Sequence, residues 1–141
     1  MLINGKYLYV INWFGTSNLS VYDISVPAYM TLVGQVATGG SGTGLSMYGN
    51  YIYAADENNN VIRVFDVSNP RGPLLANTVS TSASARNTLV KGNRLYVAHS
   101  STPGRVSNYD LSSPKTPALL SSSVTPIDST TVLASFNKYL Y

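Results

Sequence analysis

Apolar and polar residues alternate along most of this chain, in short runs rich in Tyr, Val, Ile, Leu and Phe that are bounded by Gly, Asn, Ser and Pro. Alternation with a period of two indicates β-strands, and the bounding residues are typical of turns. In the middle of the chain the pattern predicts four strands, at residues 51–55, 61–67, 74–79 and 87–91. No helical periodicity occurs anywhere in the sequence, so we expect an all-β fold.

The pattern recurs at a nearly fixed interval. The second tyrosine of one strand pattern returns every 43 to 45 residues, as Tyr9, Tyr53, Tyr96 and Tyr141. Such a period indicates stacked units of supersecondary structure. We expect a single repeat domain over residues 1–141, with repeats at about 5–48, 49–91 and 92–136 and the start of a further repeat at 137–141.

Four strands in one period is the content of one blade, the four-stranded antiparallel sheet of a β-propeller. A β-sandwich is the competing all-β fold, but its strands usually keep one face in water. The strand at 61–67 is apolar on both sides, with Ile62 and Val64 on one side and Val61 and Phe65 on the other. A blade packs on both faces, so we predict a β-propeller-type array of about three blades, a partial propeller, with the first strand of each repeat innermost.

Aspartate and proline recur where one strand of each repeat ends and a Ser-x-Pro turn begins. An Asp side chain can accept backbone N–H bonds there, and proline fixes φ and ends the strand. A group that shapes a turn is needed once per sheet, whereas a catalytic group usually occurs once. We therefore assign structural turn roles to Asp23, Asp66, Asp110, Pro27, Pro70 and Pro114.

The segment Tyr-Ile-Tyr-Ala-Ala-Asp at 51–56, followed by Val-Ile-Arg-Val-Phe-Asp-Val-Ser-Asn-Pro at 61–70, resembles the LVIVD repeat of bacterial and archaeal proteins. The resemblance spans nearly the whole chain, although Asn108 stands where other copies have valine. It implies a β-propeller, commonly of a surface or secreted protein, and it carries over no catalytic residue. A more distant resemblance is to surface-layer and lactonase-like propeller repeats.

Charge and composition limit the kinds of partner that we expect this chain to bind. Only 11% of residues are charged, and the nine Lys and Arg residues are scattered, giving a net charge of +3. Without a basic cluster we expect no nucleic acid partner, and without a run of about 18 apolar residues we expect no membrane insertion. Zero cysteines exclude disulfides and thiolate metal sites. The many neutral polar residues favour an extracellular or cell-surface location.

The copies differ at one end of the expected sheets. Successive connections alternate between the two ends of a blade, so the six variable loops share one face, at residues 12–18, 37–43, 56–60, 80–86, 99–104 and 125–130. Conserved scaffolds commonly carry binding residues on such loops. We predict that this face binds a protein, a small molecule or a glycan through Trp13, Phe14, Asp56, Glu57, Arg86, His99 and Asp128.

These residues favour a non-catalytic binding module with no cofactor. After the turn aspartates are set aside, four candidate metal ligands remain, barely enough for one site: Asp56, Glu57, His99 and Asp128. No Gly-x-Ser-x-Gly motif occurs, and we expect the lone His99 at the surface. The alternative is part of a metal-dependent, lactonase-like hydrolase whose other ligands lie on blades outside this chain.

The number of predicted blades is small for a propeller. Propellers close with about four to eight blades. We therefore expect this chain to be a piece of a larger ring, completed by further blades of the same parent chain. Closure by a homo-oligomer is the alternative.

Overall fold

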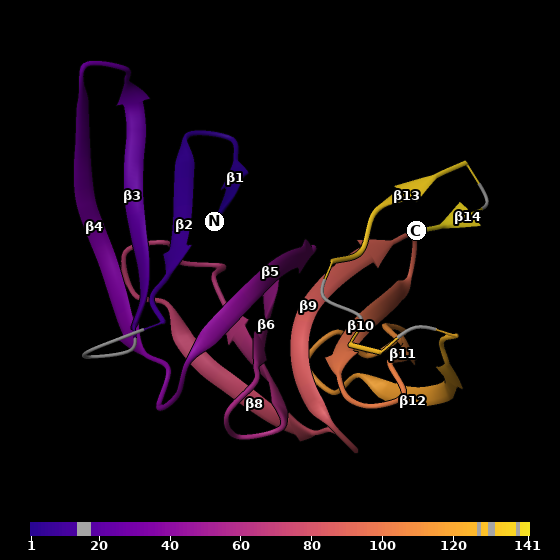
Figure 1. Ribbon diagram of the computed structural model, residues 1–141. Helices are drawn as coiled ribbons and strands as arrows, with labels where there is room; N and C mark the ends of the chain where they lie inside the picture. The colour runs from indigo at the N-terminus through magenta and orange to yellow at the C-terminus, as the bar shows by residue number, and fades with distance from the viewer. Residues whose placement is uncertain (14–17, 127, 130–131, 138) are drawn as a thin grey trace.

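The computed structural model describes residues 1–13, 18–126, 128–129, 132–137 and 139–141. These residues form fourteen strands and no helix, so the described part of the chain holds no helix long and apolar enough to cross a membrane. Twelve of the strands form three sheets, which follow one another along the chain and are arranged side by side (Figure 1).

Each of the three sheets has four antiparallel strands that pair in sequence order. The first sheet contains β1 (Leu2–Asn4), β2 (Tyr7–Ile11), β3 (Asn18–Val26) and β4 (Tyr29–Ala37). The second contains β5 (Gly42–Tyr48), β6 (Tyr51–Asp56), β7 (Val61–Asp66) and β8 (Leu74–Ser80). The third contains β9 (Ser84–Lys91), β10 (Arg94–Ser100), β11 (Arg105–Asp110) and β12 (Ala118–Val124). The predicted all-β array of three four-stranded antiparallel sheets is confirmed, and the array is not closed into a ring.

Each sheet begins one strand earlier than the repeat boundaries that we placed at Gly49 and Gly92. These glycines lie inside tight turns that join β5 to β6 and β9 to β10, with Tyr48 paired to Tyr51 across the first of them. Their φ values of 58° and 56° are left-handed, which glycine adopts without steric cost. The innermost strand therefore precedes the glycine turn rather than following it, and β5 and β9 pack against each other there (Figure 1).

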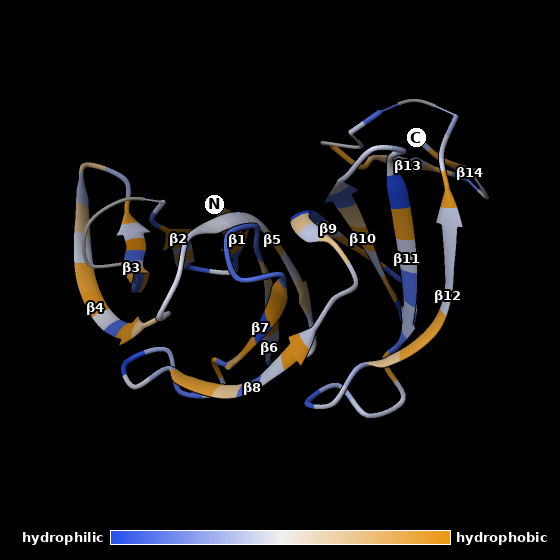
Figure 2. Ribbon diagram, turned by 60° about the horizontal axis from the view of Figure 1, so that its bottom comes forward, coloured by the Kyte–Doolittle hydropathy of each residue, from blue (hydrophilic) through white to orange (hydrophobic). Residues whose placement is uncertain are grey.

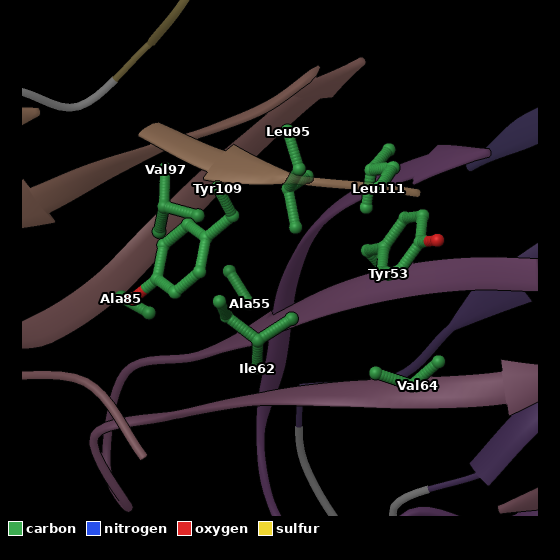
Figure 3. Close-up of a cluster of buried hydrophobic side chains, with 9 residues drawn as sticks. All are labelled: Tyr53, Ala55, Ile62, Val64, Ala85, Leu95, Val97, Tyr109 and Leu111. Atoms are coloured by element: carbon green, nitrogen blue, oxygen red, sulfur yellow. The ribbon is translucent and has the colours of Figure 1, made fainter. Parts of the chain in front are cut away.

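The second sheet is buried on both faces, as the alternation in β7 predicted. Its contact with the third sheet, here called the second joint, is a cluster of nine buried residues (Figure 3): Tyr53, Ala55, Ile62, Val64, Ala85, Leu95, Val97, Tyr109 and Leu111. Its contact with the first sheet, the first joint, buries Tyr9, Leu19, Val21, Ile52, Ala54, Phe65 and Val67. Adjacent residues of one strand thus serve opposite neighbours, since side chains alternate across a sheet.

The outer strands carry a β-bulge at the same place in every sheet. The register shifts after Val21 in the first sheet, after Val64 in the second and after Asn108 in the third. A bulge bends its strand and increases the local twist. All three sheets therefore have the same local distortion. Figure 2 shows how hydrophobic and hydrophilic residues alternate along β11 beside it.

A short hairpin follows the third sheet. It pairs β13 (Ser135–Phe136) with β14 (Tyr139–Leu140), and its turn residue Asn137 has a φ of 53°. That value matches the glycines that begin the earlier turns, and asparagine is the residue that adopts it most readily after glycine. The hairpin therefore repeats the geometry of β5 and β6. Leu133, just before it, is buried.

The recurring aspartates shape the turns at the end opposite the variable loops. The Ser68 backbone N–H donates to Asp66 Oδ1 at 2.9 Å, and Ser25 donates to Asp23 in the same way. Asp110 accepts from Ser112 at 3.3 Å. These hydrogen bonds favour the charged carboxylate, so the pKa of each aspartate is lowered. We call this end of the array the turn end and the opposite end the loop end.

Candidate functional site

Hydrogen bonds between variable loops bring them together at the loop end. The Thr81 N–H donates to the Asn60 carbonyl at 2.8 Å, which joins the connection after β8 to the β6–β7 loop. The Asn58 amide donates to the Ser41 hydroxyl at 3.0 Å, which joins that loop to the connection before β5. Ser129 donates to the Ser101 carbonyl at 2.9 Å on the third sheet. Neighbouring variable loops at the loop end are therefore joined in pairs by hydrogen bonds.

Asp56 does not lie on that surface, contrary to our prediction. It is 1% exposed at the end of β6. One of its oxygens accepts from Arg63 Nε at 2.9 Å and Nη2 at 2.8 Å, and the carboxylate also accepts from the Asn59 backbone and amide. A buried carboxylate needs such partners. Asp56 therefore anchors the β6–β7 loop and is not available to a ligand.

His99 is also buried, although we expected it at the surface. It lies within β10, where Nδ1 is 3.1 Å from the Ala83 carbonyl and Nε2 is 2.8 Å from the Ser107 hydroxyl. A carbonyl only accepts, so Nδ1 carries the proton and Nε2 accepts from Ser107. Burial lowers the pKa of His99, and the nearby charge of Arg105 lowers it further. The neutral His99 side chain therefore links the third sheet to the connection that precedes it through hydrogen bonds.

A pocket of about 470 Å³ opens at the loop end, where the inner strands of the sheets end. Trp13, 36% exposed, follows β2 and forms one wall. The other lining residues come from β2, β5, β9 and the segment before β13: Ile11, Gly42, Thr43, Arg86, Asn87 and Val132. We call it the loop-end pocket. It draws on all three sheets, so it exists only when the sheets are packed together.

The close approach of the inner strands depends on glycine. A Cβ atom at Gly42 would lie 2.1 Å from Ile11 Cδ1, and one at Gly44 would lie 2.8 Å from Asn87 Cα. Real Cβ atoms do not approach other atoms so closely. Glycine at these two positions therefore lets β5 contact β2 on one side and β9 on the other, which sets the width of the pocket floor.

An ion pair stands beside the pocket. Arg86 Nη1 donates to Glu57 Oε1 at 2.7 Å, and the Arg86 side chain is 40% exposed while that of Glu57 is 16% exposed. The second carboxylate oxygen, Glu57 Oε2, is buried and has no hydrogen-bond partner among the described residues. A buried carboxylate oxygen is normally paired, so this atom is an acceptor without its donor.

Comparison with known proteins shows which family this chain belongs to. Residues 1–38 and 39–81 each match the LVIVD repeat. The chain belongs to the LVIVD repeat family. Each matched repeat contains one whole sheet, β1 to β4 in the first and β5 to β8 in the second, so the family repeat and the structural sheet have the same boundaries.

One solved structure similar to this LVIVD chain is that of a functionally unknown protein from Desulfotomaculum acetoxidans DSM 771. The TM-score is 0.67 at 19% sequence identity, over 89% of this chain and 44% of that one. The LVIVD chain therefore spans less than half of that protein, and the likeness shows the fold alone. No curated protein matches the chain.

The seven binding residues predicted for this LVIVD chain have different locations. Trp13 and Arg86 line the loop-end pocket, and Glu57 contacts Arg86. Asp128 is exposed at the loop end but does not line the pocket, and Phe14 lies outside the described residues. No group of three metal-ligating side chains occurs in the described part of the chain. The sequence reasoning missed Asn87, because it placed this residue in a strand and searched only loops. It included Thr43 in the loop at 37–43 but did not single it out.

A second hollow, of about 330 Å³, lies at the turn end between the first and second sheets. It is lined by Asp23, Ser25, Val26, Tyr29, Thr31, Val33 and Arg71. The Asp23 carboxylate there already accepts from Ser25 and pairs with Lys6 at 3.4 Å. Asp23 and Ser25 thus belong to a turn that recurs in each of the three sheets, which favours a structural groove over a ligand site.

Proposed function

We propose that this LVIVD chain is a non-catalytic binding module of a surface or secreted protein and that its ligand occupies the loop-end pocket. The observation that carries the proposal is the pocket itself, where an aromatic wall that follows β2 and a guanidinium and an amide from β9 line one space. Ligand pockets are typically apolar concavities of about 300–1,000 Å³ with a few placed polar groups. The loop-end pocket falls in that range of volume, and its lining combines apolar side chains with a few polar groups.

The test uses Trp13 as its reporter, because it is the only tryptophan of the chain. The folded chain is titrated with amino acids, nucleosides, inorganic phosphate and sugars while tryptophan emission and the melting temperature are followed. A ligand that binds only the folded state raises the melting temperature. The proposal requires at least one compound to change both signals in the natural chain and not in Arg86→Ala, while the turn-end variant Arg71→Ala keeps the response.

One observation favours a second candidate, part of a metal-dependent hydrolase. The unpartnered Glu57 Oε2 is a potential ligand for a divalent cation. Titration with Ca²⁺, Zn²⁺ and Mn²⁺ tests this candidate. A rise in melting temperature that disappears in Glu57→Gln would support a metal site, whereas unchanged melting with all three cations would count against it.

We further propose that additional sheets complete the ring, from a longer parent chain or from a second copy of this one. The open array supports this, because the core clusters of the described residues join the second sheet to both neighbours but none joins the first sheet to the third, and large apolar side chains such as Leu120 and Phe136 are exposed. Light scattering separates the two sources. A monodisperse dimer supports closure by a second copy, and a monomer supports further repeats of a parent chain.

A further inference from the structure

We infer that the ligand of the loop-end pocket is a neutral saccharide, an inference that rests on the function proposed above. The lining combines a flat apolar wall with paired donors and acceptors. Trp13 supplies the wall, and Ile11 extends the apolar surface beside it. A sugar ring has an apolar C–H face and a rim of hydroxyl groups, which matches an aromatic wall bordered by polar side chains.

The polar groups around the pocket suit hydroxyls, which both donate and accept. Arg86 presents several N–H groups, of which one bonds to Glu57. The Asn87 side chain makes no hydrogen bond within the described residues, so its amide offers donors and an acceptor. Thr43 donates to the Ala55 carbonyl at 3.3 Å and keeps an acceptor. A neighbouring pair of sugar hydroxyls could bridge such groups.

The charges of Arg86 and Glu57 disfavour an anionic ligand in this pocket. Arg86 is the cationic residue of the pocket lining, and its guanidinium is already paired with the Glu57 carboxylate at 2.7 Å. A phosphate or carboxylate ligand would gain attraction from the first and meet repulsion from the second. Glu57 does not line the pocket and its second carboxylate oxygen is buried, so its negative charge lies behind Arg86. A neutral hydroxyl-bearing ligand avoids that repulsion and can bond to the lining groups of Arg86, Asn87 and Thr43, and the volume of about 470 Å³ accommodates a mono- or disaccharide.

The test is a titration of the full chain with methyl glucoside, methyl galactoside, methyl mannoside, cellobiose, maltose and lactose. Calorimetry gives Kd, and Trp13 emission provides a second readout. At least one sugar is expected to bind. Trp13→Ala should weaken that binding by about tenfold or more, because the wall is lost, while Trp13→Phe should weaken it less, because an aromatic face remains. Glu57→Gln should also weaken it, and Arg71→Ala at the turn end should not.

The outcomes separate this inference from the general proposal. If no sugar binds but a nucleoside, an amino acid or phosphate binds in an Arg86-dependent manner, the saccharide is wrong and the binding module stands. If no compound binds, both are wrong. Sugar binding that is equal in the natural chain and in Trp13→Ala overturns the placement in the loop-end pocket. Circular dichroism shows whether each variant is folded. If Trp13→Ala is not folded, Trp13→Phe is compared with the natural chain instead.

Discussion

The two joints between sheets close in different ways, although the same repeat builds both. At the second joint, side chains reach across to the next Ser-x-Pro turn. The Tyr53 hydroxyl donates to the Pro114 carbonyl at 2.8 Å, and the Asn77 amide donates to the Lys115 carbonyl at 3.0 Å. At the first joint, the backbone itself approaches, and a Cβ atom at Gly34 would lie 2.2 Å from the Pro70 carbonyl oxygen.

Gly34 and Asn77 are equivalent positions, because they pair with Val21 and Val64 respectively, each at the bulge of its outer strand. One side chain thus decides how the following turn is held. With glycine, the backbone of the turn packs directly against the strand. With asparagine, the turn lies one side chain away and accepts a hydrogen bond from the amide. The repeat therefore tolerates two contact distances at its joints while keeping the same pairing within each sheet.

Removing a large, wholly apolar side chain of the first joint should have the largest effect. Phe65 is fully buried between the first and second sheets. Phe65→Ala is expected to lower the free energy of unfolding by about 3–5 kcal/mol, through lost burial and the cavity left behind. Urea unfolding measures the change. Leu74→Ala, on the same sheet but 64% exposed, is the control, with an expected change within about 0.5 kcal/mol. Similar losses in the two variants would contradict the assigned core.

Forcing a side chain into the first joint should open that joint selectively. Gly34→Ala places Cβ against the Pro70 carbonyl oxygen and is expected to cost about 1–3 kcal/mol. Hydrogen exchange should show faster opening of β3 and β4 amides, with those of β10 and β11 unchanged. The matched variant Asn77→Ala loses two hydrogen bonds, one to the Lys115 carbonyl and one from the Thr78 N–H, and should cost about 0.5–1.5 kcal/mol for each. Uniform acceleration across the chain would mean that the joints do not open separately.

Deleting one hydroxyl should weaken the second joint. Tyr53→Phe removes the hydrogen bond to the Pro114 carbonyl and keeps the ring in the core, for an expected loss of about 1 kcal/mol. Tyr96 is the equivalent residue of the third sheet, and its hydroxyl makes no hydrogen bond within the described residues. Thermal unfolding of Tyr53→Phe and Tyr96→Phe compares the two deletions. An equal effect of both would show that the bond to Pro114 contributes nothing measurable.

The smallest expected effect is a pH dependence of stability that arises from His99, which bonds the third sheet to the connection before it. His99 is the only histidine, and its pKa is lowered below its ordinary 6.5 by burial. The unfolded chain therefore takes up a proton first, and stability should fall as pH drops below about 6.5, reaching a plateau below the folded pKa. Protonation also removes the acceptor that Nε2 gives to Ser107. Urea unfolding between pH 7.5 and pH 5 measures this fall in stability.

His99→Gln supplies the control for that measurement, because glutamine cannot titrate. Its stability should change less over the same pH interval. The turn aspartates do not contribute to the change in stability over this pH interval. Their lowered pKa values place their own contribution at lower pH, where stability is lost as the carboxylates protonate below about 3.8. A fall of equal size in the natural chain and in His99→Gln would show that His99 is not the titrating group.

The sequence predicted the array because its signals are local and repeated. Alternation in β7 placed Ile62 and Phe65 on opposite faces, and both faces are buried. The period came from the tyrosines, but a period does not specify where a unit begins. A glycine turn is expected both inside a hairpin and between two units. The turn at Gly49 joins β5 to β6, and a repeat boundary placed at this turn puts the sheets one strand late.

The candidate site was less predictable, because burial there depends on contacts between separate strands. Asp56 is covered by Arg63 from the next strand, and His99 by Ser107 and the Ala83 carbonyl. None of these pairings is visible in the alternation of apolar residues. Topology alone placed the variable loops at one end, which was enough to place Trp13 and Arg86 at that end. It could not show which loop residues point into the protein.

The boundaries of the repeats also bear on how a gene of this kind lengthens. The family repeats meet between residues 38 and 39, and the second ends at residue 81, so both borders fall in connections between sheets. A duplication of DNA with these ends inserts four strands that already pair with one another. The common bulge gives the inserted sheet the twist of its new neighbours. A breakpoint at Gly49 or Gly92 would instead separate an innermost strand from its partner, so recombination between sheets is the route that preserves a foldable product at every step.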